Sequence, residues 1–258
     1  MSIKEINQIK RNILKVASSA GEGHLGSSFS VLDLLFVLYD GVANISPSNQ
    51  NSKDRDFVIL SKGHASLGHA AILEKNGFIT EKELRSYCSH HSILGGHLSR
   101  CSVPGVEVST GSLGHGVAVG AGIALSSKIK SLENKVFVIV GDGEINEGTF
   151  WETLLLASHH DLNNIFFIID YNRSNDRALM LDPLEKKIES FGCDVEIIDG
   201  HNHKDLRRSL SQNLSNKPKA LIAKTIKGKG ILEMENNPAW HHRTPTDEDV
   251  LRMLEELN

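Results

Sequence analysis

Apolar residues recur along this chain with two different spacings, and their alternation predicts an α/β fold. A helical spacing runs over residues 3–20, where one face carries Ile3, Ile6, Ile13, Val16 and Ala17. The glycine-rich motif at 21–26 is expected to end that helix. Short, almost unbroken apolar runs follow at FVIL (57–60), KVFVIV (135–140), IFFIID (165–170), VEII (195–198) and ALIAKTI (220–226). Such runs are typical of parallel strands buried on both faces of a sheet.

Helical segments separate these runs, and capping residues mark several of their first turns. Further helices are predicted at 112–130, at 149–160 and near 203–214. Helix starts are predicted from four signals: Ser30, Thr80 with Glu83, Asp182-Pro183, and Thr246 with Asp249. No internal repeat or linker interrupts the alternation. We therefore expect one domain over residues 1–258, a doubly wound parallel sheet with helices on both faces.

The composition narrows the function without naming it. Of 258 residues, 40% are apolar and 23% charged, as in ordinary globular proteins. A formal charge of −4 without a dense basic stripe argues against a nucleic-acid partner. No apolar run approaches the roughly 18 residues of a membrane span, and the N-terminus lacks a signal-peptide run. Three widely spaced cysteines, Cys88, Cys101 and Cys193, fit a reducing cytoplasm better than a zinc site or a disulfide framework.

The strongest chemical signal stands at the ends of two predicted strands. Gly141-Asp142-Gly143 follows one run, and Asn172 follows the next. Ligands of doubly wound sheets bind at the carboxyl ends of strands, so these residues are expected to approach each other. A carboxylate, an amide oxygen and a main-chain carbonyl suit Mg²⁺ or Ca²⁺, and the flanking glycines let backbone amides approach a diphosphate. The loop 109–116 carries GxxGxG and no suitably placed acidic residue, so a Rossmann site is not indicated.

Several independent motifs resemble those of transketolases, in the same order along the chain. The pattern GDGEINEGTFWETLLLASHH…NNIFFIIDYN is similar to the thiamine diphosphate motif of that family, and the likeness runs from about residue 8 to about residue 245. It also includes GHLGSSFSVLDLLFVLY, LSKGHASLGHA, GGHLSRCSVPGVEVSTGSLGHG and KGKG…MENNPAWHH. The resemblance implies a thiamine diphosphate-binding fold. It also implies transfer of a two-carbon ketol unit from a ketose to an aldose, with phosphorylated sugars expected as substrates.

The resemblance also assigns roles to individual residues. It implies that Asp142 and Asn172 bind the metal through their side chains, and that Ser174 adds its main-chain carbonyl. The residues expected to hold thiamine diphosphate are His64, Gly111, Ser112, Leu113, Gly143, Asn172 and His242. The metal is expected to be Mg²⁺, or Ca²⁺ in its place.

The catalytic roles implied by the resemblance fall on histidines. His24 and His97 match residues that face the sugar and assist proton transfer, and His242 matches one near the diphosphate and the substrate. Glu147 matches a glutamate at the subunit contact. The other histidines do not belong to such motifs and are expected to be turn residues or surface groups: His69, His90, His91, His159, His160, His201 and His203.

Three departures from the family pattern stand out. The segment RSNDRALMLDPLEKK after Asn172 is shorter than expected, which affects the predicted ligand Ser174. Arg243 stands where a glycine is usual, either as a surface arginine or as a contact for a substrate phosphate or sulfonate. His115 replaces the usual glutamine and is interpreted as a variant loop residue.

The chain ends where the pyrimidine-binding domain of a transketolase would begin. The resemblance therefore implies a separate C-terminal subunit that carries the pyrimidine domain and the catalytic glutamate, together with self-association of this chain. Two alternatives remain at this stage. One is another thiamine diphosphate enzyme component, such as a deoxyxylulose-phosphate-type synthase or a 2-oxo acid dehydrogenase. The other is a non-catalytic paralogue.

Overall fold

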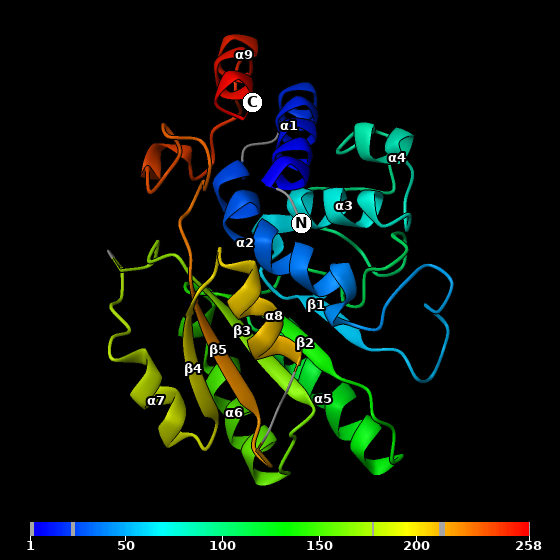
Figure 1. The fold of residues 1–258 in the computed structure, drawn as a ribbon, viewed down its shortest axis with the longest axis vertical. Coiled ribbons are helices and arrows are strands. Elements are labelled where there is room, and N and C mark those ends of the chain that lie inside the picture. The colour runs from blue at the N-terminus through cyan, green and yellow to red at the C-terminus, as the bar shows by residue number, and fades with distance from the viewer. Residues whose placement is uncertain (1–2, 22–23, 177, 212–214, 258) are drawn as a thin grey trace.

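Five parallel strands form the centre of the molecule, in the order β1-β2-β3-β5-β4 (Figure 1). The strands are β1 (Phe57–Leu60), β2 (Val136–Gly141), β3 (Ile165–Tyr171), β4 (Asp194–Asp199) and β5 (Lys219–Lys224). All five lie where the apolar runs predict them. In the register of β2 and β3, Gly141 lies beside Asp170. These two strands therefore end together at one edge of the sheet, which is where the polar residues follow.

The computed structural model describes residues 3–21, 24–176, 178–211 and 215–257. The helices in these ranges are α1 (Ile3–Ala20), α2 (Leu25–Val37), α3 (Ser66–Lys75), α4 (Glu81–Arg85), α5 (His115–Ile129), α6 (Gly148–His159), α7 (Leu184–Ser190), α8 (His203–Ser211) and α9 (Asp247–Glu256). Parts of the predicted glycine-rich break at 21–26 and of the helix predicted at 203–214 lie outside the described residues.

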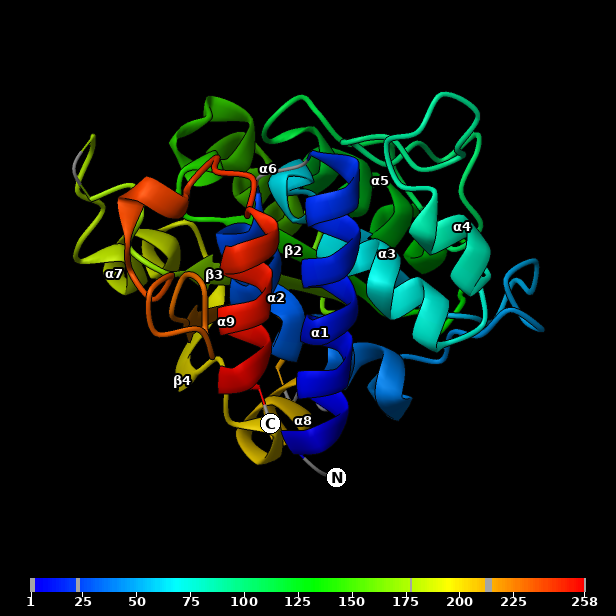
Figure 2. The same ribbon diagram turned by 90° about the horizontal axis from the view of Figure 1, so that it is seen from above.

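Helices cover both faces of the sheet, as the sequence predicts. One apolar core joins the sheet to α1, α2, α3, α8 and α9, and a second joins it to α5, α6 and α7 (Figures 1 and 2). Along β3, Phe166 and Ile168 enter the first core, whereas Phe167 and Ile169 enter the second. This alternation follows from the two-residue repeat of a strand. In Figure 2, α9 lies beside α1, where Arg11 donates to the carbonyl of Leu254 at 2.9 Å.

Capping predictions are confirmed at two helices and wrong at two. Thr80 and Thr246 each form a complete capping box at α4 and α9. Ser30 caps nothing, because α2 already begins at Leu25 and places Ser30 in its buried interior. Asp182 is not a helix cap either: Pro183 precedes α7, and the Asp182 carboxylate accepts a hydrogen bond from the Tyr171 hydroxyl at 2.7 Å.

Two further expectations about apolar residues need correction. Ile3 is 78% exposed, so it does not join the buried face of α1. The 18-residue stretch Leu25–Val42, with a mean hydropathy of 1.4, does have the length and composition of a membrane span. However, 83% of that stretch is buried inside the domain, because α2 packs between the sheet and the helices α1 and α3. Its hydropathy is accounted for by this core position.

Candidate active site

Asp142 and the loop after Asn172 meet at the carboxyl edge of the sheet. Asp142 is only 4% exposed, and its Oδ1 accepts hydrogen bonds from the Gly143 amide at 2.8 Å and from the Ser174 hydroxyl at 3.2 Å. The Asn175 amide approaches Oδ2 at 3.4 Å. The juxtaposition predicted from two strand ends is therefore present. The roles of Asp142, Asn172 and Ser174 as metal ligands stay predictions.

The chemistry of this corner fits a divalent cation. Burial raises the pKa of Asp142, and the positive charge of Lys62 opposes that effect. A bound cation would favour the ionised carboxylate. Among the described residues, no group of three or more His, Cys, Asp or Glu side chains is placed to hold a metal. The donor set that the resemblance implies is instead mixed: one carboxylate, the Asn172 amide oxygen and the Ser174 carbonyl, all hard oxygens of the kind Mg²⁺ prefers.

A buried polar network beneath this corner was missed by the sequence reasoning. Asp170 is fully buried, pairs with the Lys62 ammonium, and accepts hydrogen bonds from the hydroxyls of Ser30 (2.6 Å) and Thr225. The Asn172 amide nitrogen donates to Ser30 Oγ at 3.0 Å and to Asp170 at 3.1 Å. Because both donors of that amide are committed, its oxygen turns the other way, toward the Ser174 amide at 3.0 Å. The network thus sets which atom of Asn172 faces the site.

Lys62 and Asp170 form a buried ion pair in which the attraction and the hydrogen bonds outweigh the cost of burying the carboxylate. Burial alone would raise the pKa of Asp170, but the adjacent ammonium and the hydroxyl donors outweigh it and hold the pKa below its usual value. Asp170 is therefore ionised at neutral pH. One signal could have found the pair: SKGH follows a buried strand, and an aspartate ends an otherwise apolar one.

Removing the cation of this pair should strongly destabilise the chain. We expect Lys62→Met to lower the free energy of unfolding by about 3–5 kcal/mol, because it leaves the Asp170 carboxylate buried without a counter-charge. Urea unfolding of the full chain measures the loss. The double variant Lys62→Met/Asp170→Asn should recover much of it, since no unpaired charge remains. If the double variant is no more stable than Lys62→Met, the unpaired charge is not the cause.

Five histidine rings lie close together above the buried network of Asp170 and Lys62. They come from four separate segments of the chain. The ring centroid of His24 lies 4.8 Å from that of His64 and 4.5 Å from that of His242. His97 lies 6.0 Å from His64, and His241 lies 6.1 Å from both His24 and His64. The structure therefore brings together all four histidines that the resemblance selected. His241 was not among them, although it belongs to the same motif as His242.

His241 is the histidine of the cluster that shares a pocket with the polar corner. Together with Asn172, Ser174 and Lys227 it lines a cavity of about 640 Å³. Its Nδ1 is 2.7 Å from the Lys227 ammonium, and burial with this neighbouring charge lowers the pKa of His241. A neutral ring at this position can accept a hydrogen bond from the ammonium. His242 instead lies beside His24, so the two adjacent histidines lie in different parts of the site.

His64 sits in the middle of the cluster and is held neutral. Burial, followed by the nearby rings of His24, His97 and His241, lowers the pKa of His64 to about 4. A neutral imidazole near pH 7 can accept one hydrogen bond and donate another, which suits contact with a polar ligand. Gly63 makes room for this arrangement. A Cβ at that position would lie 2.3 Å from His97 Nδ1.

The loop carrying Gly111, Ser112 and Leu113 is tied to the strand ends by Glu144, another residue that sequence reasoning missed. The buried Glu144 carboxylate accepts from the amides of Gly114 at 2.8 Å and Gly141 at 3.2 Å, and from the Ser61 hydroxyl. Gly111 adopts a φ of +134°, a conformation that favours glycine. Because Gly111 and Ser112 are exposed, their backbone remains accessible to a ligand.

Comparison with known proteins identifies the family. The model of the transketolase thiamine diphosphate binding domain matches residues 2–257. This chain belongs to the transketolase family. It is 38% identical to a subunit of the apulose-4-phosphate transketolase from Actinobacillus succinogenes, over 98% of this chain and 95% of that protein. It is 32% identical to the 6-deoxy-6-sulfo-D-fructose transketolase subunit SqwG of a Clostridium species, over 95% of this chain and 91% of that one.

Solved structures give the same family at the level of the fold. The transketolase from Leishmania mexicana superposes with a TM-score of 0.91 at 25% sequence identity. That match covers 100% of this chain but 41% of the other, so this chain spans less than half the length of that transketolase. It corresponds in length to the two relatives that are named as transketolase subunits. It also has the parallel α/β fold of the thiamine diphosphate-binding domain.

The residues at which this transketolase-family chain departs from the usual pattern lie in ordinary structural settings. The Arg243 guanidinium pairs with Asp249 at 2.8 Å and stacks over the Trp240 ring at 4.2 Å. This favours the interpretation as a surface arginine over a substrate contact. His115 is exposed at the first turn of α5. Glu147, which matches the family pattern, is exposed just before α6.

Three of the histidines set aside on sequence grounds are not surface groups. His69 is 2% exposed and bonds the Tyr39 hydroxyl at 2.9 Å. His201 and His203 both contact the buried carboxylate of Asp33. By contrast, the remaining four stand as exposed neighbouring pairs: His90, His91, His159 and His160.

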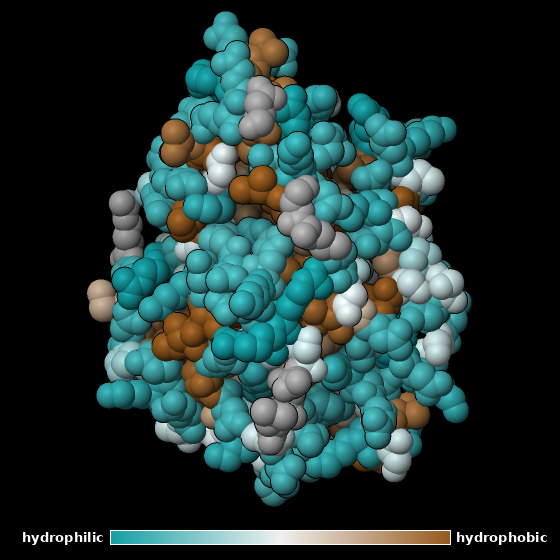
Figure 3. Space-filling view, viewed as in Figure 1, coloured by the Kyte–Doolittle hydropathy of each residue, from teal (hydrophilic) through white to brown (hydrophobic). Residues whose placement is uncertain are grey.

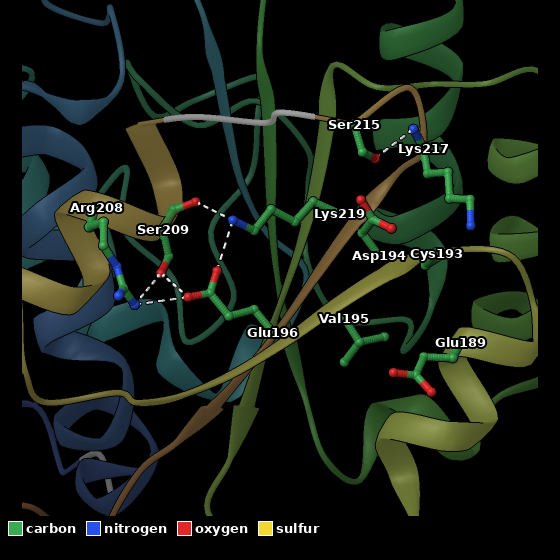
Figure 4. A pocket seen from close by; sticks show the side chains of 10 residues that line it. All are labelled: Glu189, Cys193, Asp194, Val195, Glu196, Arg208, Ser209, Ser215, Lys217 and Lys219. Carbon is green, nitrogen blue, oxygen red and sulfur yellow. Dashed lines mark hydrogen bonds and ion pairs between the residues drawn. The ribbon is translucent and has the colours of Figure 1, made fainter.

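A second pocket, of about 840 Å³, lies at the opposite end of the sheet (Figure 4). It opens at the first residues of β4 and β5, whereas ligands of this fold bind at the last ones. Inside it, Glu196 is already paired with Lys219 at 2.9 Å and with Arg208 at 2.9 Å. These polar groups satisfy one another, so we assign the active site to the histidine cluster.

Proposed function

We propose that this chain is the N-terminal subunit of a two-subunit transketolase, which moves a two-carbon ketol unit from a ketose to an aldose. The observation that carries the proposal is a cluster of five histidines, one of which, His241, lines the same cavity as Asn172 and Ser174 at the strand ends. Such an arrangement combines a metal-diphosphate corner with several imidazole rings that can donate and accept hydrogen bonds. The family membership supports the same assignment.

The cofactor would lie along the carboxyl edge of the sheet. Asp142, Asn172 and the Ser174 carbonyl would hold Mg²⁺, whose charge would offset that of the diphosphate. The backbone of residues 111–113, Gly143, His64 and His242 would hold the diphosphate, and His241 lies next to them in the same histidine cluster. Thiamine diphosphate, when bound, supplies the carbon nucleophile and the electron sink for cleaving and forming the carbon–carbon bond.

The histidines of this chain would remove protons from the sugar's hydroxyl groups and return them. His24 and His97 come from different segments and flank His64, so they can reach different hydroxyls of one sugar. Cleavage of a ketose requires removal of a hydroxyl proton, and transfer to an aldose requires return of one to the new alkoxide oxygen. An imidazole ring can perform both steps, because its nitrogens can accept a proton and donate one.

An anionic sugar is the best-supported substrate class. The relatives include subunits named for apulose 4-phosphate and for 6-deoxy-6-sulfo-D-fructose, and both names specify a phosphate or a sulfonate. The cationic groups Lys62 and Lys227 lie in the site itself, where each has a carboxylate or a histidine as neighbour. Because both ammonium groups already have partners, we expect the phosphate or sulfonate group of the sugar to bind away from them. It would bind at the entrance of the site, where the second subunit completes it.

A partner subunit and a second copy of this chain would cover helices α5 and α6. These helices expose large apolar side chains: Val119 is 44% exposed, Ile129 75%, Leu155 57% and Leu156 44%. The face shown in Figure 3 is mostly polar, with apolar side chains in small separate groups. We propose that the pyrimidine domain and the catalytic glutamate come from a C-terminal subunit, and that the assembly works in the cytoplasm.

Alanine variants of His24 and His97 should separate catalysis from cofactor binding. Each should lower turnover by roughly 10²–10⁴, the usual scale for a lost general acid–base group. Affinity for thiamine diphosphate should barely change, and His90→Ala, at an exposed histidine outside the cluster, should retain full activity. Steady-state kinetics of the assembled complex provide the measurement. Full activity in either variant with the true substrate would remove that residue from the mechanism.

Co-expression with the pyrimidine-domain subunit tests the function directly. The purified complex, supplied with thiamine diphosphate and Mg²⁺, is assayed with phosphorylated and sulfonated ketose donors and a set of aldose acceptors. Transfer lengthens the acceptor by two carbons and releases an aldose two carbons shorter than the donor. Absence of transfer from every such donor, in a complex that binds the cofactor, would contradict the proposal.

A further inference from the structure

A buried hydrogen-bonded chain outside the histidine cluster runs from helix α2 to the backbone of the active site. His201 Nδ1 lies 2.8 Å from Asp33 Oδ2, and the Ile226 amide donates to His201 Nε2 at 2.9 Å. The side chains are largely buried, 9% exposed for Asp33 and 12% for His201. Because a backbone amide can only donate, Nε2 must be the acceptor and the ring proton resides on Nδ1. The contacts therefore select one neutral tautomer of His201.

The peptide held by His201 lies between two side chains of the site. Thr225 donates its hydroxyl to Asp170, and Lys227 places its ammonium 2.7 Å from His241 Nδ1. Strand β5 ends at Lys224, and the Thr225 amide still reaches the Tyr171 carbonyl at 3.3 Å. The next amide, that of Ile226, donates to His201 instead of to the sheet. His201 thus takes over the role of a neighbouring strand where the sheet stops.

Helix α2 supports the site at two points one turn apart. Ser30 bonds Asp170 and Asn172, and Asp33, three residues later, bonds His201. Burial by itself would raise the pKa of Asp33, but hydrogen bonds from His201 and His203 lower it to about 2. The carboxylate is therefore charged at neutral pH and needs its donors. This need keeps the His201 ring oriented with Nε2 toward Ile226.

We propose that His201, oriented by Asp33, is a positioning residue of the active site, which fixes the Thr225–Lys227 segment by accepting the Ile226 amide. It touches neither substrate nor cofactor. Its effect reaches the chemistry through Lys227, which follows Ile226 just past the end of β5 and whose ammonium lies beside His241. The effect on catalysis rests on the proposed function, whereas the effect on the Ile226 amide does not.

His203 provides a matched control on the same carboxylate. Its Nε2 lies 2.6 Å from Asp33 Oδ1 and its ring stacks on Phe36 at 5.5 Å, so its contacts are to α2 and not to the 225–227 segment. His203→Ala therefore removes one donor from Asp33 and leaves the bond to Ile226 in place. His201→Gln is the conservative variant, since its amide offers a donor and an acceptor and does not titrate.

Hydrogen–deuterium exchange of the assembled complex tests the contact itself. In His201→Ala, the Ile226 amide should exchange about tenfold faster, the scale of one lost hydrogen bond, with wild-type rates in the core of β3. His203→Ala should leave Ile226 protected, and His201→Gln should restore most of the protection. Unchanged exchange at Ile226 in His201→Ala, or equal acceleration in His203→Ala, would overturn the proposal. If His201→Ala does not fold, His201→Leu, which fills similar space without an acceptor, replaces it.

Kinetics and cofactor binding form the second arm. His201→Ala should lower turnover by roughly ten- to a hundredfold, the scale of misplacing a catalytic group, and His201→Gln should recover most of that loss. Equal turnover in His201→Ala and wild type, or no recovery in His201→Gln, would refute the positioning role. If the wild-type complex shows no ketol transfer, the proposed function fails while the exchange measurement still decides the contact.

Discussion

Replacing Asp142 by alanine should abolish tight binding of thiamine diphosphate and leave the domain folded. The carboxylate is the one anionic side chain of the proposed metal set, and without it the diphosphate and the cation lose their link to β2. We expect the affinity to fall by more than about a hundredfold, beyond the effect of losing a supporting contact. Calorimetric titration of the assembled complex with cofactor and Mg²⁺ measures this, and thermal unfolding confirms the fold.

Asn172→Ala should give a similar loss of cofactor affinity and should lower the stability of the fold more than Asp142→Ala does. The reason is that the Asn172 amide also donates hydrogen bonds to the buried side chains of Ser30 and Asp170. Glu189→Ala is the matched control. It removes a carboxylate from the pocket at the other end of the sheet and should leave cofactor binding unchanged. Cofactor affinities equal to wild type in both Asp142→Ala and Asn172→Ala would sink the metal assignment, whatever the activity of the enzyme.

The chain alone should show no ketol transfer, and activity should appear only with the second subunit. The structure holds the strand-end corner and the histidines, but within the described residues we find no buried glutamate facing them other than Glu144, which is committed to Ser61 and two amides. The subunit naming of the relatives supports a missing partner. An assay of the highly purified chain, with and without the pyrimidine-domain subunit, gives the answer. Transfer by the single chain would refute the two-subunit assignment.

The assembly surface can be tested by itself. Leu155→Glu places a charge on the exposed apolar face of α6 and should weaken assembly, as measured by light scattering. Leu232→Glu is the matched control, because Leu232 is 80% exposed but lies outside α5 and α6. Equal assembly of both variants would place the interface elsewhere on the chain.

Much of the fold could be predicted from local pattern. Strands β2 and β3 were legible because they are buried along their whole length and therefore apolar at nearly every position. The edge strand β4 is only partly buried, and its prediction rested on the short run VEII. The capping boxes at Thr80 and Thr246 were correct, because a hydroxyl and a carboxylate three residues apart close on each other through local geometry alone. Ser30 and Asp182 failed as caps, since in both cases a distant partner, Asp170 or Tyr171, engages the side chain.

In the candidate site, too, some residues could be predicted from the sequence and others could not. Asp142 and Asn172 were predicted from their places after two successive strands, since parallel strands end at a common edge. His24, His64, His97 and His242 were selected through family motifs rather than through any spacing among themselves. Lys62, Asp170 and Glu144 were missed because the significance of each depends on a partner far away in the sequence.

By itself, the sequence determined the order of helices and strands, the parallel sheet and the two strand ends at which Asp142 and Asn172 stand. These follow from periodicity and from short-range rules, which act over a few residues. Only the tertiary structure decided that His241 joins the cluster, that Asn172 turns its oxygen toward Ser174, and that His201 supports Ile226. Hydrogen bonds of this kind join residues from separate elements, and a buried polar group takes whichever partner the packed fold brings within reach.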